Sequence, residues 1–95
     1  MAFETARVPT ENGAKYLQQL CKHWSHKLDV QLSENEGIVR FPAAVATMTA
    51  DSEALTVKVE AKDDETLQRM KGVVASHLDR FAFREAPLPF EWSKG

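Results

Sequence analysis

The side chains with the greatest chemical potential lie in one stretch, Leu20–Lys27, with the sequence Leu-Cys-Lys-His-Trp-Ser-His-Lys. It contains the only cysteine of the chain, Cys21, and two of the three histidines, His23 and His26. Thiolates and imidazoles bind zinc and iron, and a cysteine activated by a histidine is a nucleophile. These residue types suggest a metal site, a catalytic thiol or, together with the lysines, an anion-binding surface.

Helix geometry separates Cys21 from the histidines. Apolar residues recur at spacings of three and four from Ala14 to Leu28, which predicts an amphipathic helix with Cys21 on its apolar stripe. Residues two apart on a helix point about 160° away from each other, so Cys21 and His23 cannot reach one ion. A reactive cysteine also needs an accessible, electropositive setting, whereas free cysteine is usually buried. We expect Cys21 and Trp24 to be core residues.

His23 and His26 form a candidate basic face together with Lys22 and Lys27. Two imidazoles three residues apart can bind iron or zinc, but without a nearby carboxylate the site would be weak. The basic face could instead contact a small anionic ligand or a partner protein. A third interpretation of these charged residues is an ordinary solvent-exposed helix surface. The sequence leaves these alternatives open.

His77 lies at the edge of the apolar stripe of a second predicted helix. Its simplest interpretation is a partly buried histidine with one hydrogen bond. It becomes a further metal-ligand candidate, beside His23 and His26, only if the two helices are adjacent.

The acidic residues do not form a catalytic pair. Asp63–Glu65 fits the capped start of a helix, and Glu34–Glu36 and Asp51–Glu53 fit turns. Phosphate-binding glycine loops, the nucleophile elbow and the C-x-x-C motif do not occur. We therefore expect a non-enzymatic binding or accessory protein with no evident cofactor; a small enzyme without a recognisable motif is the last alternative.

The elements that must position these residues follow from periodicity and from turn residues. They are a strand over Phe3–Val8, a helix capped by Thr10 and running to Lys27, strands near Val30–Leu32, Ile38–Phe41, Ala44–Ala50 and Leu55–Ala61, a helix from Asp63 or Asp64 to Phe81, and a short strand within the proline-rich tail 83–92. Gly37 is expected to supply a positive φ in a hairpin loop, and Gly72 to mark a close approach of the second helix to the sheet.

This order, β-α-β-β-β-β-α with a short C-terminal β, predicts the fold class. Consecutive hairpins make an antiparallel sheet, and both helices must cover its apolar face. The expected fold is an α+β two-layer sandwich, with a topology similar to the half-repeat of the TATA-binding-protein-like fold.

Length and charge narrow the functional class. Ninety-five residues fit a single domain over 1–95, and a net charge of −2 argues against nucleic-acid binding. The chain has neither an apolar run long enough to span a membrane nor a signal peptide, and one cysteine cannot form an internal disulfide, so we expect a cytoplasmic protein. The sequence is compatible with a monomer or a homodimer; apolar side chains left on the uncovered sheet face, such as Ile38, Met48 or Trp92, would favour a dimer.

Several segments together carry a family resemblance. They are Ala6–Val8, Tyr16–Lys27, Leu55–Ala61, and His77–Glu85 closing on Phe90–Trp92, with Cys-Lys-His-Trp-Ser-His-Lys and Arg-Phe-Ala-Phe-Arg-Glu the most specific runs. Over nearly the whole chain they resemble a bacterial family catalogued as domain of unknown function 2218. The resemblance implies a stand-alone bacterial domain without an established activity. Relatives beside or fused to siderophore-interacting proteins imply a link to iron or siderophore handling, and the resemblance assigns no catalytic residue.

Overall fold

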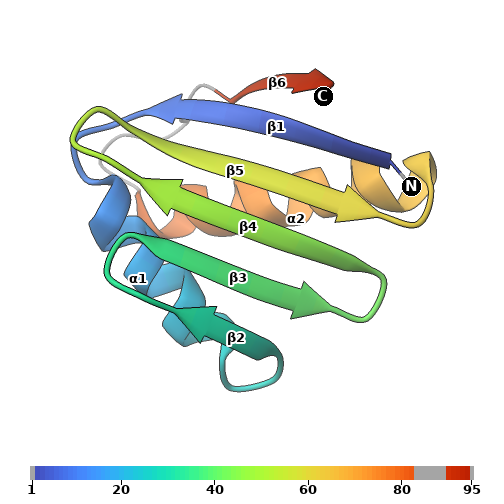
Figure 1. Ribbon diagram of the computed structural model, residues 1–95, viewed down its shortest axis with the longest axis horizontal. Coiled ribbons are helices and arrows are strands. Elements are labelled where there is room, and N and C mark those ends of the chain that lie inside the picture. The colour runs from blue at the N-terminus through green and yellow to red at the C-terminus, as the bar shows by residue number, and fades with distance from the viewer. Residues whose placement is uncertain (1, 83–89, 95) are drawn as a thin grey trace.

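Six strands form one antiparallel sheet, and two helices pack against one of its faces (Figure 1). The computed structural model describes residues 2–82 and 90–94. The elements are β1 (Ala2–Pro9), α1 (Gly13–Trp24), β2 (Asp29–Leu32), β3 (Glu36–Phe41), β4 (Ala44–Ala50), β5 (Ala54–Ala61), α2 (Asp64–Phe81) and β6 (Glu91–Lys94).

The strand order in the sheet is β2-β3-β4-β5-β1-β6. Strands β2 to β5 form the predicted meander, and β1 pairs with β5, so the first strand lies beside the last strand of the meander. The α+β class and the two-layer arrangement of an antiparallel sheet and two helices are confirmed. Strand β6 pairs with β1 at the sheet edge, as expected for the end of the tail, whereas residues 83–89 of that tail lie outside the described part.

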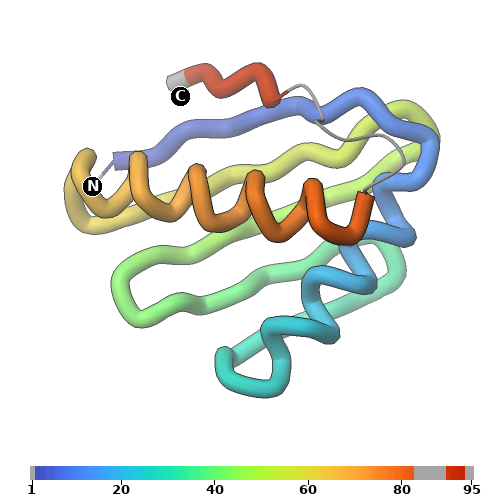
Figure 2. Tube along the Cα trace, turned by 180° about the vertical axis from the view of Figure 1, so that it is seen from behind, coloured from blue at the N-terminus to red at the C-terminus, as the bar shows by residue number. Residues whose placement is uncertain are grey.

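The core lies between the sheet and the helices. Strand β5 contributes every second side chain, and α1 and α2 contribute their apolar stripes; fully buried examples are Val57, Val59, Leu17, Leu20, Leu67, Val74 and Leu78. Seen from the helix side, α1 lies beside the C-terminal end of α2, and the two helices diverge from there (Figure 2). None of the described helices is long and apolar enough to cross a membrane.

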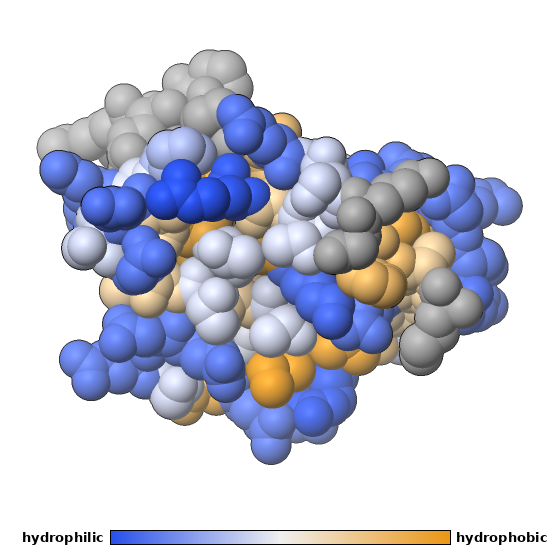
Figure 3. Space-filling view, turned by 45° about the horizontal axis from the view of Figure 1, so that its top comes forward, coloured by the Kyte–Doolittle hydropathy of each residue, from blue (hydrophilic) through white to orange (hydrophobic). Residues whose placement is uncertain are grey.

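The opposite face of the sheet carries mainly polar side chains. In the space-filling view, blue and pale side chains dominate it, with small orange areas (Figure 3). One row across the strands reads Ser93, Thr5, Lys58, Thr47, Ile38 and Gln31. Of the side chains expected to leave an apolar remnant here, Met48 is instead fully buried, and Trp92 packs against the core beside Lys71. This face resembles the solvated side of an ordinary antiparallel sheet.

Both ends of α1 differ from the prediction. The helix begins at Gly13, so Asn12 and not Thr10 is the N-cap. The N–H of Thr10 donates to Glu53 O (3.0 Å), and its hydroxyl accepts a hydrogen bond from Asn12 N (3.1 Å). The helix ends at Trp24 rather than Lys27. The N–H groups of Lys27 and Leu28 both donate to Trp24 O, at 3.1 and 2.9 Å, and this turn leads the chain into β2.

Two glycines have roles other than those predicted. Gly37 is buried within β3 and not at a positive φ, and it is glycine because α1 approaches so closely: a Cβ there would lie 2.5 Å from Cys21 Sγ. Gly72 faces open space, and a methyl group added to it would meet no atom within 4 Å. The close approach to the sheet therefore occurs under α1, not under α2.

Candidate functional site

The stretch Leu20–Lys27 divides into a buried and an exposed set. Leu20 and Cys21 are fully buried and Trp24 is 7% exposed, whereas the side chains of the basic face (Lys22, His23, His26 and Lys27) are exposed. Burial raises the pKa of the Cys21 thiol to about 11. A buried, protonated thiol is neither a nucleophile nor a metal ligand, so Cys21 is the core residue that helix geometry predicts.

The structure brings His23 and His77 together at the contact between the helices. Their ring centroids are 5.5 Å apart, and the Phe81 ring lies 5.7 Å from His23. The centroid of the Trp24 ring lies 5.4 Å from that of His77 and 5.3 Å from that of Phe41 on β3. We call these five side chains the histidine–aromatic cluster. It answers the question that the sequence left open, since α1 and α2 are adjacent at His77.

His77 is held by its own helix. Its Nδ1 lies 2.8 Å from Val73 O, and because a carbonyl can only accept, Nδ1 carries the proton. With Nδ1 as the donor, Nε2 is the ring nitrogen left for another partner. This agrees with the expected partly buried histidine that makes one hydrogen bond.

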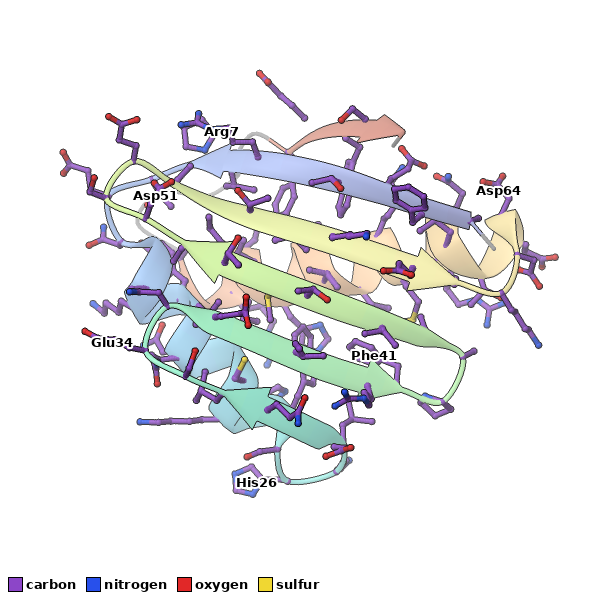
Figure 4. The ribbon with its side chains drawn as sticks, in the orientation of Figure 1. Arg7, His26, Glu34, Phe41, Asp51 and Asp64 are labelled. Atoms are coloured by element: carbon purple, nitrogen blue, oxygen red, sulfur yellow. The ribbon has the colours of Figure 1, made fainter. Side chains whose placement is uncertain are left out.

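A cavity of about 360 Å³ opens at the C-terminal end of α1. It is lined by His23, Trp24, His26, Lys27 and Leu28. Trp24 and Leu28 supply apolar surface, and the other three residues supply nitrogen donors. No carboxylate lines it among the described residues. His26 projects away from the sheet beside the turn that follows α1 (Figure 4). We call this space the α1-end cavity.

A second cavity, of about 420 Å³, lies at the turn between β3 and β4. It is lined by Phe41, Pro42, Ala43, Ala44, Val45, Glu60, Ala61 and Lys62. Phe41, at the end of β3 in Figure 4, also contacts Trp24, which links the walls of the two cavities. Sequence reasoning missed Phe41 and Phe81 as site residues, because each is an ordinary apolar position in its own element.

The comparisons with known proteins assign the family. The profile of the family described as "Uncharacterized protein conserved in bacteria", domain of unknown function 2218, matches residues 5–93. The chain belongs to this family. The NMR structure of PA4090 from Pseudomonas aeruginosa is similar, with 33% identity, a TM-score of 0.84, and coverage of 98% of this chain and 96% of that chain. The search of curated proteins found no match.

Within this family member, the predicted metal ligands do not form one cluster. His23 meets His77 and also lines the α1-end cavity with His26, which lies in the turn beyond the helix, whereas His77 does not line that cavity. Among the described residues, no group of three or more histidines, cysteines and carboxylates could hold a metal ion.

Another polar group, missed in the sequence, joins α2 to the sheet. Glu4 is 6% exposed on the helix side of β1, and its carboxylate accepts from Lys71 Nζ (3.1 Å) and Gln68 Nε2 (3.0 Å). Lys71 Nζ also lies 5.1 Å from the centre of the Trp92 ring. The sequence offered one signal for this group: in a strand, Glu4 falls on the same face as the apolar Ala6 and Val8, so its carboxylate would need a partner there. The contacts explain Glu4 as part of a structural ion pair that ties α2 to β1.

Proposed function

We propose that this protein is a non-enzymatic binding module whose ligand is a small anion with a planar, apolar body, bound in the α1-end cavity. The observation that carries the proposal is the lining of that cavity, which combines three residues that carry nitrogen donors, His23, His26 and Lys27, with Trp24 and Leu28. A chain with net charge −2 thus has a local site with no lining carboxylate among the described residues.

The balance of charges at this helix end favours an anion. A helix C-terminus disfavours anions by about 0.3–1 kcal/mol, because its last carbonyls are unpaired. Here the terminal carbonyls are partly occupied, since Ser25 Oγ donates to Lys22 O (2.8 Å) and two N–H groups donate to Trp24 O. A hydrogen bond to a charged group contributes about 1.5–3 kcal/mol, so even one from Lys27 outweighs the helix end.

The apolar part of the ligand follows from Trp24. Aromatic rings favour offset or edge-on contacts with other planar groups, worth about 0.5–1.5 kcal/mol beyond burial. Trp24 packs against Phe41 and His77, so its ring needs little ordering when a ligand binds. An aryl carboxylate combines the required charge and shape.

A narrower form of the proposal is an iron chelate. Aryl hydroxy-acids carry an anionic group on a planar ring and bind ferric iron through oxygen, so the same cavity chemistry would accept their iron complexes. The link to siderophore handling that the family resemblance implies supports this choice. The complex of one ferric ion with one salicylate dianion is a cation, so the test uses the complex with three salicylates, which is an anion. This complex should bind more tightly than salicylate alone, and equal or weaker binding would restrict the proposal to the free anion.

The test uses benzoate, its neutral analogue benzamide, and the indole N–H signals of Trp24 and Trp92 in NMR spectra. Benzoate should shift the Trp24 signal and leave Trp92 unchanged, and benzamide should bind at least about tenfold more weakly, because it lacks the charge. Lys27→Glu should weaken benzoate binding by a similar factor.

Lys15→Glu is the matched control, since it makes the same charge change on an exposed position of α1 that does not line the cavity. If the two charge reversals weaken benzoate equally, the anion responds to overall charge and not to this site. If benzoate leaves Trp24 unshifted, the proposal is wrong.

A further inference from the structure

We infer that His23 and His77 form a two-histidine site for a divalent transition metal, bridging α1 and α2. The observation is the 5.5 Å separation of their ring centroids across two helices. This site lies beside the α1-end cavity but differs from it, because His77 does not line that cavity. It also differs from the pair His23 and His26 that spacing along the first helix suggests.

The separation of the rings fits a shared ion. Each imidazole nitrogen lies ~2.0–2.1 Å from a bound zinc ion, so two rings at a near-tetrahedral angle have centroids roughly 5 Å apart. The observed separation is close to this value, and the rings are tilted by 45° rather than stacked. Rotation of the exposed His23 side chain supplies the small adjustment that remains.

His77 has the support that metal-binding histidines usually have. Such a ligand commonly donates its second ring N–H to a backbone carbonyl, which fixes the tautomer and the ring orientation. The Nδ1–H of His77 donates in this way to Val73 O at 2.8 Å, which leaves Nε2 as the ligand atom. Trp24 packs against the same ring and limits its rotation.

The surroundings determine what kind of ion fits. Imidazole nitrogen suits zinc, copper and nickel, whereas calcium and magnesium require oxygen ligands. Exposed Lys22 and Arg80 lie near the pair in sequence and oppose a cation, and the described residues supply no third ligand. The site should therefore be of micromolar affinity, with positions left open for water or for an anion.

Zinc alone is the probe, added to the full chain without a histidine tag, and imidazole ¹H–¹⁵N NMR spectra report which nitrogens respond. One Zn²⁺ per chain should shift Nε2 of His77 and one nitrogen of His23, and should leave His26 unchanged. His77→Gln and His23→Gln should each weaken Zn²⁺ binding at least about tenfold. His26→Gln is the matched control and should bind as the unaltered chain does.

The inference is overturned if His77 does not respond to Zn²⁺, or if His26→Gln weakens binding as much as His77→Gln. The spectra of the unaltered chain decide the matter even if His77→Gln fails to fold. Failure of this site and failure of the anion site are separable. Lys27→Glu should weaken benzoate binding about tenfold and leave Zn²⁺ binding nearly unchanged, whereas His77→Gln should weaken Zn²⁺ binding at least about tenfold and benzoate binding much less.

Discussion

The Sγ atom of Cys21 occupies the space that a side chain at residue 37 would need. A Cβ on Gly37 would lie 2.5 Å from that sulfur and 3.8 Å from Leu17 Cδ1. The lone cysteine on α1 and the glycine in β3 are therefore a packing pair, which sets how closely the first helix approaches the sheet. Because Trp24 at the end of the same helix lines the α1-end cavity, the approach of α1 to the sheet also affects where that cavity lies.

Replacing Gly37 with alanine should destabilise the protein. The added methyl group overpacks a buried contact, which typically costs about 1–3 kcal/mol. The free energy of unfolding from urea titration measures the loss. An unchanged unfolding free energy would mean that α1 can move away from β3 without cost.

Cys21→Ala should partly rescue Gly37→Ala. Alone, Cys21→Ala leaves a small cavity and costs about 1 kcal/mol. In the double variant the alanine methyl at residue 37 moves into the space left by the sulfur, so the combined loss should be smaller than the sum of the single losses. Strict additivity in a double-mutant cycle would show that the two residues do not share this space.

Gly72→Ala should stabilise the protein, whereas Gly37→Ala should destabilise it. Residue 72 is an exposed position within α2, and nothing lies within 4 Å of the added methyl group. Alanine is a better helix former than glycine by about 0.8–1.0 kcal/mol, so the unfolding free energy should rise by roughly that amount. A loss of stability would reveal a contact at this position.

Cys21 should make the protein less stable at alkaline pH. Burial raises the thiol pKa from 9.0 to about 11 in the folded state, so this stabilising contribution is complete below pH 9.0 and is lost as pH rises toward 11. Over that interval the unaltered protein should lose on the order of 2 kcal/mol more than Cys21→Ala. Parallel pH profiles of the two proteins would contradict the burial of the thiol.

Asp63 should stabilise the start of α2 in a pH-dependent way. Its Oδ1 accepts from Thr66 N at 2.7 Å, and this backbone hydrogen bond holds the carboxyl pKa below its ordinary value of 3.8. The contribution is therefore present above that value and is lost as pH falls below it. Asp63→Ala should lower Tm at pH 7, and the difference from the unaltered protein should shrink in acid.

Asp63→Asn is the control for this effect, because asparagine caps helices about as well without titrating. Its Tm at pH 7 should stay near that of the unaltered protein. If Asp63→Asn is as unstable as Asp63→Ala, the charge rather than the cap hydrogen bond matters.

Patterns within single elements were sufficient for the fold. The alternation Leu55, Val57, Val59 marks a strand with one buried face, and the helical spacing placed Cys21 and Trp24 inward; both predictions are confirmed. These features could be predicted because each depends on the local period of a strand or a helix.

Contacts between elements could not be predicted in the same way. The proximity of His23 to His77, and of Trp24 to Phe41, depends on how α1 lies relative to α2 and β3. Gly37 is a second example. Its neighbours in the sequence favour a turn, but the reason that residue 37 is a glycine is its contact with the sulfur of Cys21, which is distant in the sequence. The basic face was found as a set of residues, whereas the cavity beside it appears only when the turn after Trp24 is folded.

The most direct test of the proposed binding site is a map of backbone and side-chain NMR shifts during a benzoate titration. The largest changes should lie in His23–Leu28, with smaller changes at Phe41 through its contact with Trp24. Changes centred on the polar face of the sheet, around Thr47 and Lys58, would contradict the account, as would a spectrum that does not respond to the anion.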